Sequence, residues 1–153
     1  MGCAASHDLE IEEAKYAIRR VATRDLEDGG SLLGASDENV LIVGRHQRVE
    51  DPQHDRVLLS WASSQVSVTV TGPVEGVFVQ LSAVESSSGE QQALCNVYIN
   101  NDLKDKFSVT RGVETQYRLT GPLPEGEHTV TVSKCTEGSE GLLAFDGFAF
   151  LRK

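Results

Sequence analysis

A two-residue alternation in the segment 66–71 is the feature that most constrains the fold of this chain. Valine occupies positions 66, 68 and 70, and serine or threonine occupies positions 67, 69 and 71. Because successive side chains of a strand point to opposite faces, this pattern predicts a strand with one dry and one solvated face. From Asn39 onward, turn residues separate similar short runs, with no helical pattern between them. The sequence therefore predicts an all-β fold, an antiparallel β-sandwich or jelly roll of about eight or nine strands.

The stretch from Tyr117 to Glu137 is the clearest candidate hairpin. Two strand-like runs flank the segment 123–126 (Leu-Pro-Glu-Gly), which has the composition of a turn. The second run ends in a polar cluster of Lys134, Thr136 and Glu137, whose side chains can bond to neighbouring loops. The complete set of expected strands is 40–43, 57–61, 66–71, 77–84, 94–100, 106–110, 115–120, 129–135 and 143–151.

The first 38 residues have a different pattern. Apolar residues recur at helical spacing from Ile11 to Ala22, with acidic residues in the first turns and arginines near the end, which predicts an amphipathic helix over residues 8–26. Glycine and small polar residues predict a linker over residues 27–38. The expected organisation is therefore an N-terminal tip (residues 1–7), a helix (8–26), a linker (27–38) and a β-sandwich domain (39–153).

The N-terminal tip carries a lipidation pattern. Gly2 with Ser6 matches the N-myristoylation signal, and Cys3 beside it is a position for palmitate. One myristoyl chain anchors a protein only marginally, and the acidic residues that follow cannot supply a basic second signal, so palmitate would be needed. The alternative is an accidental Met-Gly start. Acylation would place the protein on the cytosolic face of a membrane; without it we expect a cytoplasmic protein.

Charge and cysteine content narrow the function classes. A formal net charge of −9 argues against a nucleic-acid partner, which needs clustered Lys and Arg. The sequence has no run as long as a transmembrane helix and no apolar core of a secretory signal at its start. Cys3, Cys95 and Cys135 form neither a disulfide framework nor a zinc pattern. Cys95 and Cys135 could pair if their strands are adjacent, but free buried thiols are the favoured interpretation.

The sequence shows no complete catalytic or metal-binding motif. We see no serine in a glycine-flanked nucleophile turn and no histidine spacing suited to a metal, so we expect no enzyme activity and no cofactor. Asp146, with two glutamates before it, is interpreted as an ion-pair partner of Arg45, Lys134 or Arg152. Trp61, the single tryptophan, is either a core anchor or a stacking platform for a sugar ring.

Several separated motifs, taken together, resemble a known family. They are Gly44-Arg45-His46, Trp61, Val97-Tyr98-Ile99-Asn100-Asn101, Tyr117-Arg118-Leu119, Leu123-Pro124-x-Gly126-x-His128-Thr129-Val130, Lys134-x-Thr136-Glu137 and Gly147-Phe148. In this order and spacing they are similar to the N-terminal β-sandwich domain of carbohydrate esterase family 2, whose members are SGNH-type deacetylases of polysaccharides. The resemblance covers about Asn39 to Leu151. It implies an accessory domain, because the family's catalytic serine and histidine lie in a hydrolase domain that has no counterpart here.

Three functions follow as hypotheses. The first is a non-catalytic interaction module or scaffold that binds a protein through helix 8–26 or the sandwich loops and is anchored through Gly2 and Cys3. The second, implied by the resemblance, is a carbohydrate-binding accessory domain. The third is a truncated or remade acetyl esterase. The residues expected to form a binding or structural cluster are Arg45, Trp61, Lys134, Thr136 and Glu137.

Overall fold

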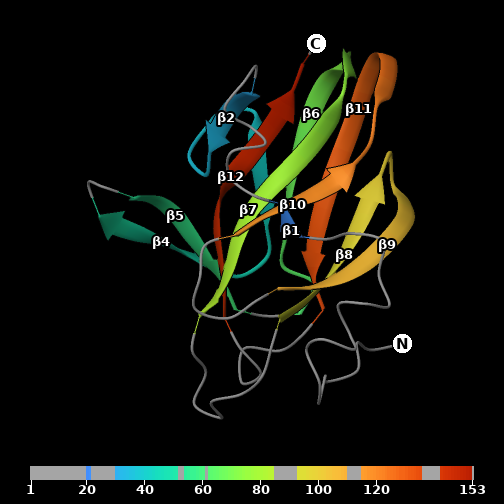
Figure 1. Cartoon of the computed structure of the whole chain (residues 1–153). Helices are drawn as coiled ribbons and strands as arrows, with labels where there is room; N and C mark the ends of the chain where they lie inside the picture. Colours follow the sequence, from blue (N-terminus) through green and yellow to red (C-terminus); the bar gives the residue numbers. More distant parts are fainter. Residues whose placement is uncertain are drawn as a thin grey trace.

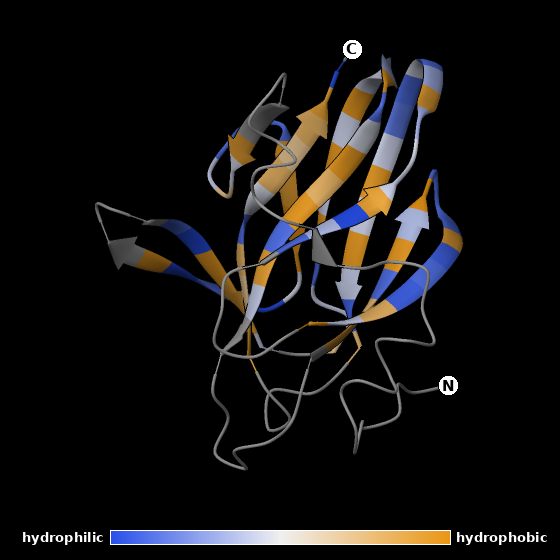
Figure 2. Ribbon diagram, in the orientation of Figure 1, coloured by the Kyte–Doolittle hydropathy of each residue, from blue (hydrophilic) through white to orange (hydrophobic). Residues whose placement is uncertain are grey.

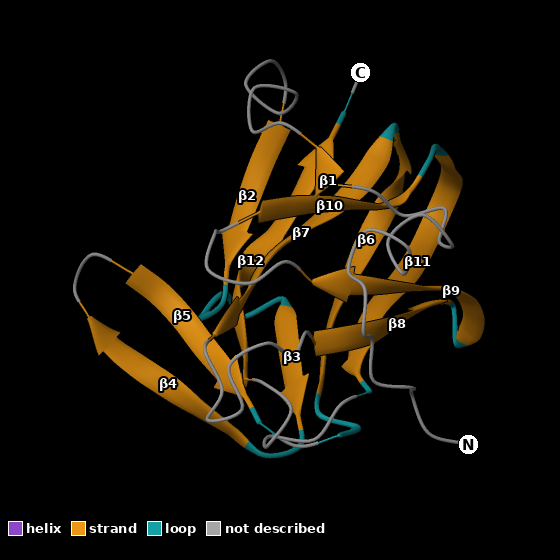
Figure 3. Ribbon diagram, turned by 60° about the horizontal axis from the view of Figure 1, so that its bottom comes forward, coloured by secondary structure: helices purple, strands orange, loops and turns teal. Residues whose placement is uncertain are grey.

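The computed structural model describes residues 20–21, 30–51, 54–60, 62–84, 93–109, 115–135 and 142–152. Within these ranges the chain forms strands and turns and contains no helix, as Figure 3 shows. It follows that no membrane-spanning helix occurs in this part of the chain. The strands are β1 (Arg20–Val21), β2 (Gly30–Gly34), β3 (Val40–Val43), β4 (His46–Asp51), β5 (His54–Leu59), β6 (Gln65–Val74), β7 (Gly76–Val84), β8 (Ala93–Ile99), β9 (Asp102–Val109), β10 (Thr115–Thr120), β11 (Leu123–Lys134) and β12 (Leu142–Leu151).

Two antiparallel sheets face each other (Figure 1). The seven-stranded sheet has the order β1-β10-β7-β12-β5-β4, with β2 also paired to β12. The five-stranded sheet has the order β3-β6-β11-β8-β9. The predicted all-β antiparallel sandwich is therefore confirmed, whereas the expected count of about eight or nine strands is too low, since the described residues form strands β1 to β12.

Alternation of side chains explains why the two sheets pack against each other. On β6 and β11 the valines point inward and the hydroxyl residues point outward, and Figure 2 shows this as alternating orange and white bands. The inward side chains of both sheets form one hydrophobic core. Phe107 of β9 and Tyr117 of β10 join the sheets through rings whose centroids are 5.0 Å apart.

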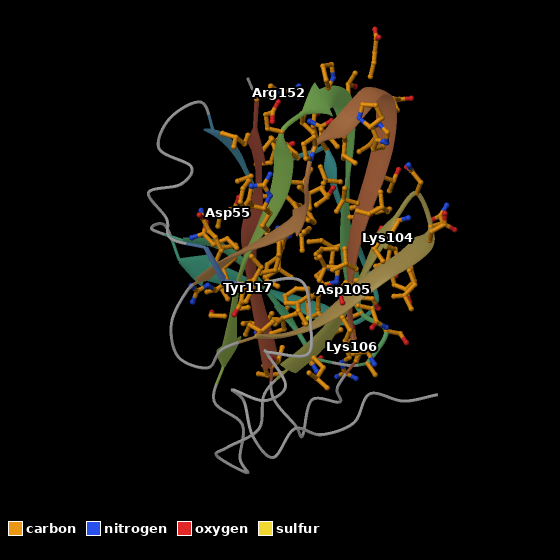
Figure 4. The ribbon with its side chains drawn as sticks, turned by 45° about the vertical axis from the view of Figure 1, so that its right-hand side comes forward. Asp55, Lys104, Asp105, Lys106, Tyr117 and Arg152 are labelled. Carbon is orange, nitrogen blue, oxygen red and sulfur yellow. The ribbon has the colours of Figure 1, made fainter. Side chains whose placement is uncertain are left out.

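The predicted hairpin from Tyr117 to Glu137 is wrong. β10 belongs to the seven-stranded sheet and pairs with β1 and β7, whereas β11 belongs to the five-stranded sheet and pairs with β6 and β8. The expected turn at 123–126 lies inside β11, where the register with β6 shifts between Leu123 and Gly126. Tyr117 (labelled in Figure 4) is buried because its side chain points into the core, where it contacts Phe107 of the other sheet.

Other expectations at the N-terminal side also change. The predicted helix 8–26 lies mostly outside the described residues, and its two described residues, Arg20–Val21, form a strand instead. The predicted linker contributes Gly30–Gly34 as β2, which pairs along the end of β12. The strand β4 was not expected, because its sequence HQRVED is polar and has no alternation.

β4 and β5 form a hairpin that projects from the sandwich (Figure 1). It is fixed at its base, where Val57, Leu58 and Leu59 of β5 pair with β12. Beyond this base, Arg56 Nε donates to Asp146 Oδ1 at 2.7 Å, and Arg56 Nη2 donates to Asp146 Oδ2 at 3.3 Å. This ion pair has two contact points and holds the hairpin against β12. It lies at the position where the pairing partner of β12 changes from β5 to β2.

Candidate functional site

The outer face of the five-stranded sheet is the candidate site. We call it the polar face, defined by the outward residues of β6, β11 and β8, which are Gln65, Ser67, Thr69, Asn96, Tyr98, Thr129, Thr131 and Ser133. Their strand neighbours, such as Val66 and Val132, point into the core. The same alternation that forms the core therefore presents hydroxyl and amide groups on the opposite side.

Strand register arranges these groups in rows across the sheet. Thr131 of β11 lies opposite Ser67 on one side and Tyr98 on the other. Ser133 similarly lies between Gln65 and Asn96. Because directly opposite residues have Cβ atoms about 4.5–5.5 Å apart, each row is a continuous strip of short polar side chains that ends at an aromatic ring or an amide.

An open hollow of about 350 Å³ lies on this face. It is lined by Ser63, Gln65, Tyr98, Asn101, Thr131 and Ser133. A ligand site of this size is usual for a small molecule or part of a larger one. The lining offers hydroxyls and amides that both donate and accept hydrogen bonds, together with one aromatic ring. Among the described residues that line it there is no charged side chain, and the groups present are suited to hydrogen bonding with a polar molecule.

Asn101 is positioned by a two-residue turn between β8 and β9. Asn100 and Asn101 both have positive φ, 51° and 70°, as a type I′ hairpin turn requires, and asparagine tolerates this conformation well. The side-chain Oδ1 of Asn100 accepts a hydrogen bond from the backbone N–H of Thr129 at 2.9 Å. The backbone N–H of Asn100 donates to the carbonyl oxygen of Thr129 at 2.8 Å. These bonds fix the turn to β11.

The imidazole ring of His128 contacts the same turn. Its Nε2 lies 2.9 Å from Pro124 O, and a carbonyl only accepts, so Nε2 carries the proton. Nδ1 then accepts from Asn100 Nδ2 at 3.2 Å. The ring therefore links the turn that carries Asn101 to the irregular start of β11.

A second hollow, of about 300 Å³, lies at the base of the projecting hairpin. It is lined by Arg45, His46, Gln47, Leu58, Ser60 and Leu142. His46 Nδ1 is 2.9 Å from Gly44 O, so the ring is held by its own turn. This hollow contains one of the predicted site residues, Arg45.

The structure places only two of the five predicted cluster residues. Arg45 is exposed, while Lys134 is buried with 1% of its surface accessible. Both backbones bond to Ser64, whose Oγ donates to Arg45 O at 3.1 Å and whose carbonyl accepts from Lys134 N at 2.8 Å. Trp61, Thr136 and Glu137 lie outside the described residues, as do Gly2 and Cys3, so their roles stay predictions. Asp146 pairs with Arg56, a partner that was not expected from the sequence.

The rest of the polar face was not identified from the sequence as a site. For Tyr98 the sequence leaves the same two alternatives as for Trp61, a core residue or a stacking platform for a sugar ring. The available signal was the solvated half of the alternating pattern, for example Ser67 and Thr69 between core valines. That signal marks a surface but does not show which separated strands share it.

The two cysteines of the sandwich do not pair with each other. Cys95 is a free, fully buried thiol, as expected, whereas Cys135 is disulfide-bonded, so the expectation of a free thiol is wrong there. Burial raises the pKa of the Cys95 thiol from 9.0 to about 12, and the charge of Lys134 opposes this rise only in part.

This pKa predicts a pH effect on stability. A thiol whose pKa is raised in the fold contributes stability that is complete below the unfolded pKa of 9.0 and is lost as pH rises toward about 12. At about pH 10 we expect the free energy of unfolding to have fallen by roughly 1 kcal/mol through this group. Urea titrations of the wild type and of Cys95→Ala at about pH 8 and pH 10 measure it. Equal pH dependence in the two proteins would contradict the prediction.

The described residues hold no group of three or more His, Cys, Asp or Glu side chains placed to bind a metal ion. The polar-face hollow is lined by hydroxyl, amide and phenol groups, and the second hollow combines polar and charged side chains with Leu58 and Leu142.

Comparison with known proteins adds a family match. A family model described as carbohydrate esterase 2 N-terminal matches residues 42–153. No curated protein sequence matches the chain.

Solved structures share the fold at low identity. A family two carbohydrate esterase from Cellvibrio japonicus is 16% identical, with a TM-score of 0.65 over 81% of this chain and 34% of that chain. A family two esterase from Clostridium thermocellum, in complex with cellohexaose, is 23% identical, with a TM-score of 0.58 over 71% of this chain and 30% of that one. The chain thus spans about a third of the length of these esterases.

A smaller protein matches over nearly its whole length. A CBM36 carbohydrate-binding module in complex with calcium and xylotriose is 17% identical, with a TM-score of 0.58, over 78% of this chain and 97% of that module. At these identities the likeness shows the fold.

Proposed function

Because this chain belongs to the carbohydrate esterase 2 N-terminal family, we propose that it is a non-catalytic carbohydrate-binding module whose ligand lies on the polar face. The observation that carries the proposal is the open hollow in which Tyr98 stands among hydroxyl and amide side chains. A sugar ring has an apolar face and a rim of hydroxyls. Tyrosine supplies a rigid apolar surface with one polar end, and the surrounding groups can bond the hydroxyls.

Two further observations support it. The backbone of the binding residues is held in place, because three hydrogen-bonded strands carry Gln65, Tyr98, Thr131 and Ser133. The CBM36 module has the same architecture as a unit of its own, so a sandwich of this size can act as a binding module without a second domain. The proposal includes no calcium, since the described residues offer no cluster of metal ligands.

The proposal assigns no catalysis to the described residues. The family match is to an N-terminal region, and the chain spans about a third of the esterases that share its fold. A hydrolytic activity would need an activated nucleophile, and the described residues that line the polar-face hollow include serines and a threonine but no base to activate them.

The role of Tyr98 is directly testable. Removing its ring in Tyr98→Ala is expected to weaken binding of xylotriose and cellohexaose at least tenfold, about 1.4 kcal/mol, because a central aromatic contact is lost. Isothermal titration calorimetry measures this. Tyr98→Phe keeps the ring and should retain most of the affinity.

A matched control addresses the second hollow. Arg45→Ala changes an exposed residue of that hollow and should leave the affinity unchanged. If Arg45→Ala abolishes binding while Tyr98→Ala does not, the ligand lies at the base of the β4–β5 hairpin and the proposed location is wrong. No binding of either sugar by the wild type would argue against the function itself.

A protein-binding role is the second candidate. Leu41 and Val43 of the edge strand β3 are 60% and 44% exposed and lie next to each other on the outer face. Adjacent exposed aliphatic side chains on an edge strand favour contact with another protein.

Anchoring through acylation of Gly2, and a position on the cytosolic face of a membrane, remain proposals that rest on the sequence pattern alone. Unchanged membrane fractionation of Gly2→Ala would remove them.

A further inference from the structure

We infer that a disulfide joins Cys3 to Cys135 and holds the N-terminal tip of the chain (residues 1–7) over the end of the polar face that contains Leu94 and Ser108. This inference goes beyond the proposed function and does not depend on which ligand the polar face binds. It follows from the state of the cysteines, from the register of β8, β9 and β11, and from the burial of two outward side chains.

The cysteine count leaves one partner for Cys135. The chain has three cysteines, at positions 3, 95 and 135. Cys135 is disulfide-bonded, and Cys95 is a free thiol. A disulfide within one chain needs a second cysteine, and Cys3 is the one that remains.

The register of the strands explains why Cys95 is not that partner. Cys95 of β8 lies directly opposite Lys134 of β11, and both side chains are buried on the inner side of the sheet. The ladder continues by one residue, because the backbone N–H of Cys135 donates to the carbonyl oxygen of Leu94 at 2.7 Å. Since successive side chains of a strand alternate, Cys135 points to the polar face. The two sulfur atoms therefore lie on opposite sides of the sheet, whereas a disulfide needs Cβ atoms that face each other.

Cys95 is also unable to displace Cys3 by exchange. Burial raises the pKa of the Cys95 thiol to about 12, so the thiol stays protonated at neutral pH. Attack on a disulfide needs a thiolate that can reach one of the sulfur atoms. A fully buried thiol on the inner side of the sheet meets neither condition. The cross-link is therefore protected from the third cysteine of the chain.

Two buried side chains beside Cys135 indicate what the tip covers. Leu94 lies opposite Cys135, and Ser108 of β9 lies opposite Leu94. Both point outward, because their neighbours Cys95 and Phe107 belong to the core, yet they are only 1% and 2% exposed. Outward positions farther along β8 are partly exposed. This end of the face is therefore covered, and a segment bonded to Cys135 is attached where the cover lies.

The cross-link places the tip at the border of the proposed site. β11 ends beside the start of β8 (Figure 1). Ser133 lines the polar-face hollow, and Cys135 is the next outward residue along the same strand direction. The open area thus extends from Ser133 toward Asn101, and the tip limits it at the other end. Reduction of the disulfide would detach the tip and lengthen the open part of the face.

The chemistry of the cross-link is thiol–disulfide exchange. The two thiols together lose two protons and two electrons as the bond between their sulfur atoms forms. Glutathione disulfide accepts them, and its own sulfur–sulfur bond breaks to give two molecules of glutathione. A sulfur atom in a disulfide cannot carry a thioester, so this bond and the palmitate expected at Cys3 from the sequence exclude each other.

Peptide mapping of the full chain tests the cross-link. The protein is equilibrated with glutathione disulfide, its free thiols are blocked in denaturant, and it is digested with trypsin without reductant. Mass spectrometry should find the peptides of Cys3 and Cys135 joined and should find Cys95 blocked. Reduction should separate the pair. Blocked Cys3 and Cys135, or Cys135 bonded to glutathione or to a second chain, would overturn the inference.

Hydroxyl-radical footprinting tests the cover. Oxidation of the Leu94 side chain should rise several-fold in Cys3→Ser and equally in Cys135→Ser, because either change detaches the tip. Leu103, which is 59% exposed in the intact protein, should be oxidised at the same rate throughout and serves as the internal control. Circular dichroism checks that the variants keep their strands. Unchanged oxidation of Leu94 would show that the chain continuing from β8 or β9 provides the cover, and would overturn the inferred position of the tip.

Discussion

Phe145→Ala is expected to lower the free energy of unfolding by about 3–5 kcal/mol. Phe145 is fully buried, and its ring packs edge-on against Phe148 with centroids 5.2 Å apart. It lies on β12 between Leu81 of β7 and Val57 of β5. Because strands border this position on both sides, the neighbours cannot collapse into the space that the ring leaves, and most of the cavity cost remains. A domain of ordinary stability, about 5–15 kcal/mol, would lose a large fraction of it.

Urea unfolding followed by intrinsic fluorescence or circular dichroism gives this value. Phe145→Leu keeps much of the apolar volume and should cost clearly less. Leu103→Ala, at a residue 59% exposed, should change stability by less than about 0.5 kcal/mol. A loss below about 1 kcal/mol for Phe145→Ala would show that the packing of β12 is looser than the contacts with Phe148 indicate.

Gly147→Ala is the second large effect, with an expected loss of about 2–4 kcal/mol from backbone strain and overpacking together. Gly147 has φ +143°, a region that side chains rarely adopt, and an added Cβ would meet the carbonyl oxygen of Leu33 on β2. The clash is with backbone that is paired to β12, so β2 would have to move away to relieve it. We expect faster amide hydrogen exchange in β2 as well as a lower unfolding midpoint.

Gly126→Ala separates the two causes. Gly126 also has a positive φ, +115°, but nothing lies within 4 Å of an added Cβ. It should therefore show the backbone cost alone, about 1–2 kcal/mol, with normal exchange in β2. If the two variants lose the same stability, the contact with β2 contributes nothing and the prediction for Gly147 is wrong.

Local pattern was sufficient for the fold class and for several strands. The bounds expected for 40–43 and 115–120 agree with β3 and β10, because polar and turn residues flank each run. The strand β4 was not predicted. It lies at a sheet edge, and its residues His46 to Arg48 are exposed, so its sequence does not alternate between buried and exposed positions. Alternation therefore detects strands that help form the core and misses those that do not.

The pairing of strands could not be predicted in the same way. Tyr117 and His128 are close in sequence and flank turn residues, which favoured a hairpin, yet their strands lie in different sheets. Partner choice depends on which buried faces fit together across the whole domain, and a local turn signal does not contain that information.

The same reason limits prediction of the site. Gln65, Tyr98 and Thr131 come from three separated segments and meet only through the register of β6, β11 and β8. The sequence showed that each is on a solvated side or in a motif, but not that they share a hollow. Lys134 is the opposite case, because a lysine at a strand end reads as exposed, and only the structure shows it to be buried.

The position of β12 has a consequence for the order in which the protein can form. This strand is the last described in the chain, and it is also the strand that joins β7 on one side to β5 and β2 on the other. During synthesis, β2, β5 and β7 therefore emerge from the ribosome without the strand that connects them. The seven-stranded sheet cannot be completed until residues 142–151 have been made. The strands on either side of β12 therefore remain unpaired with each other until translation reaches these residues.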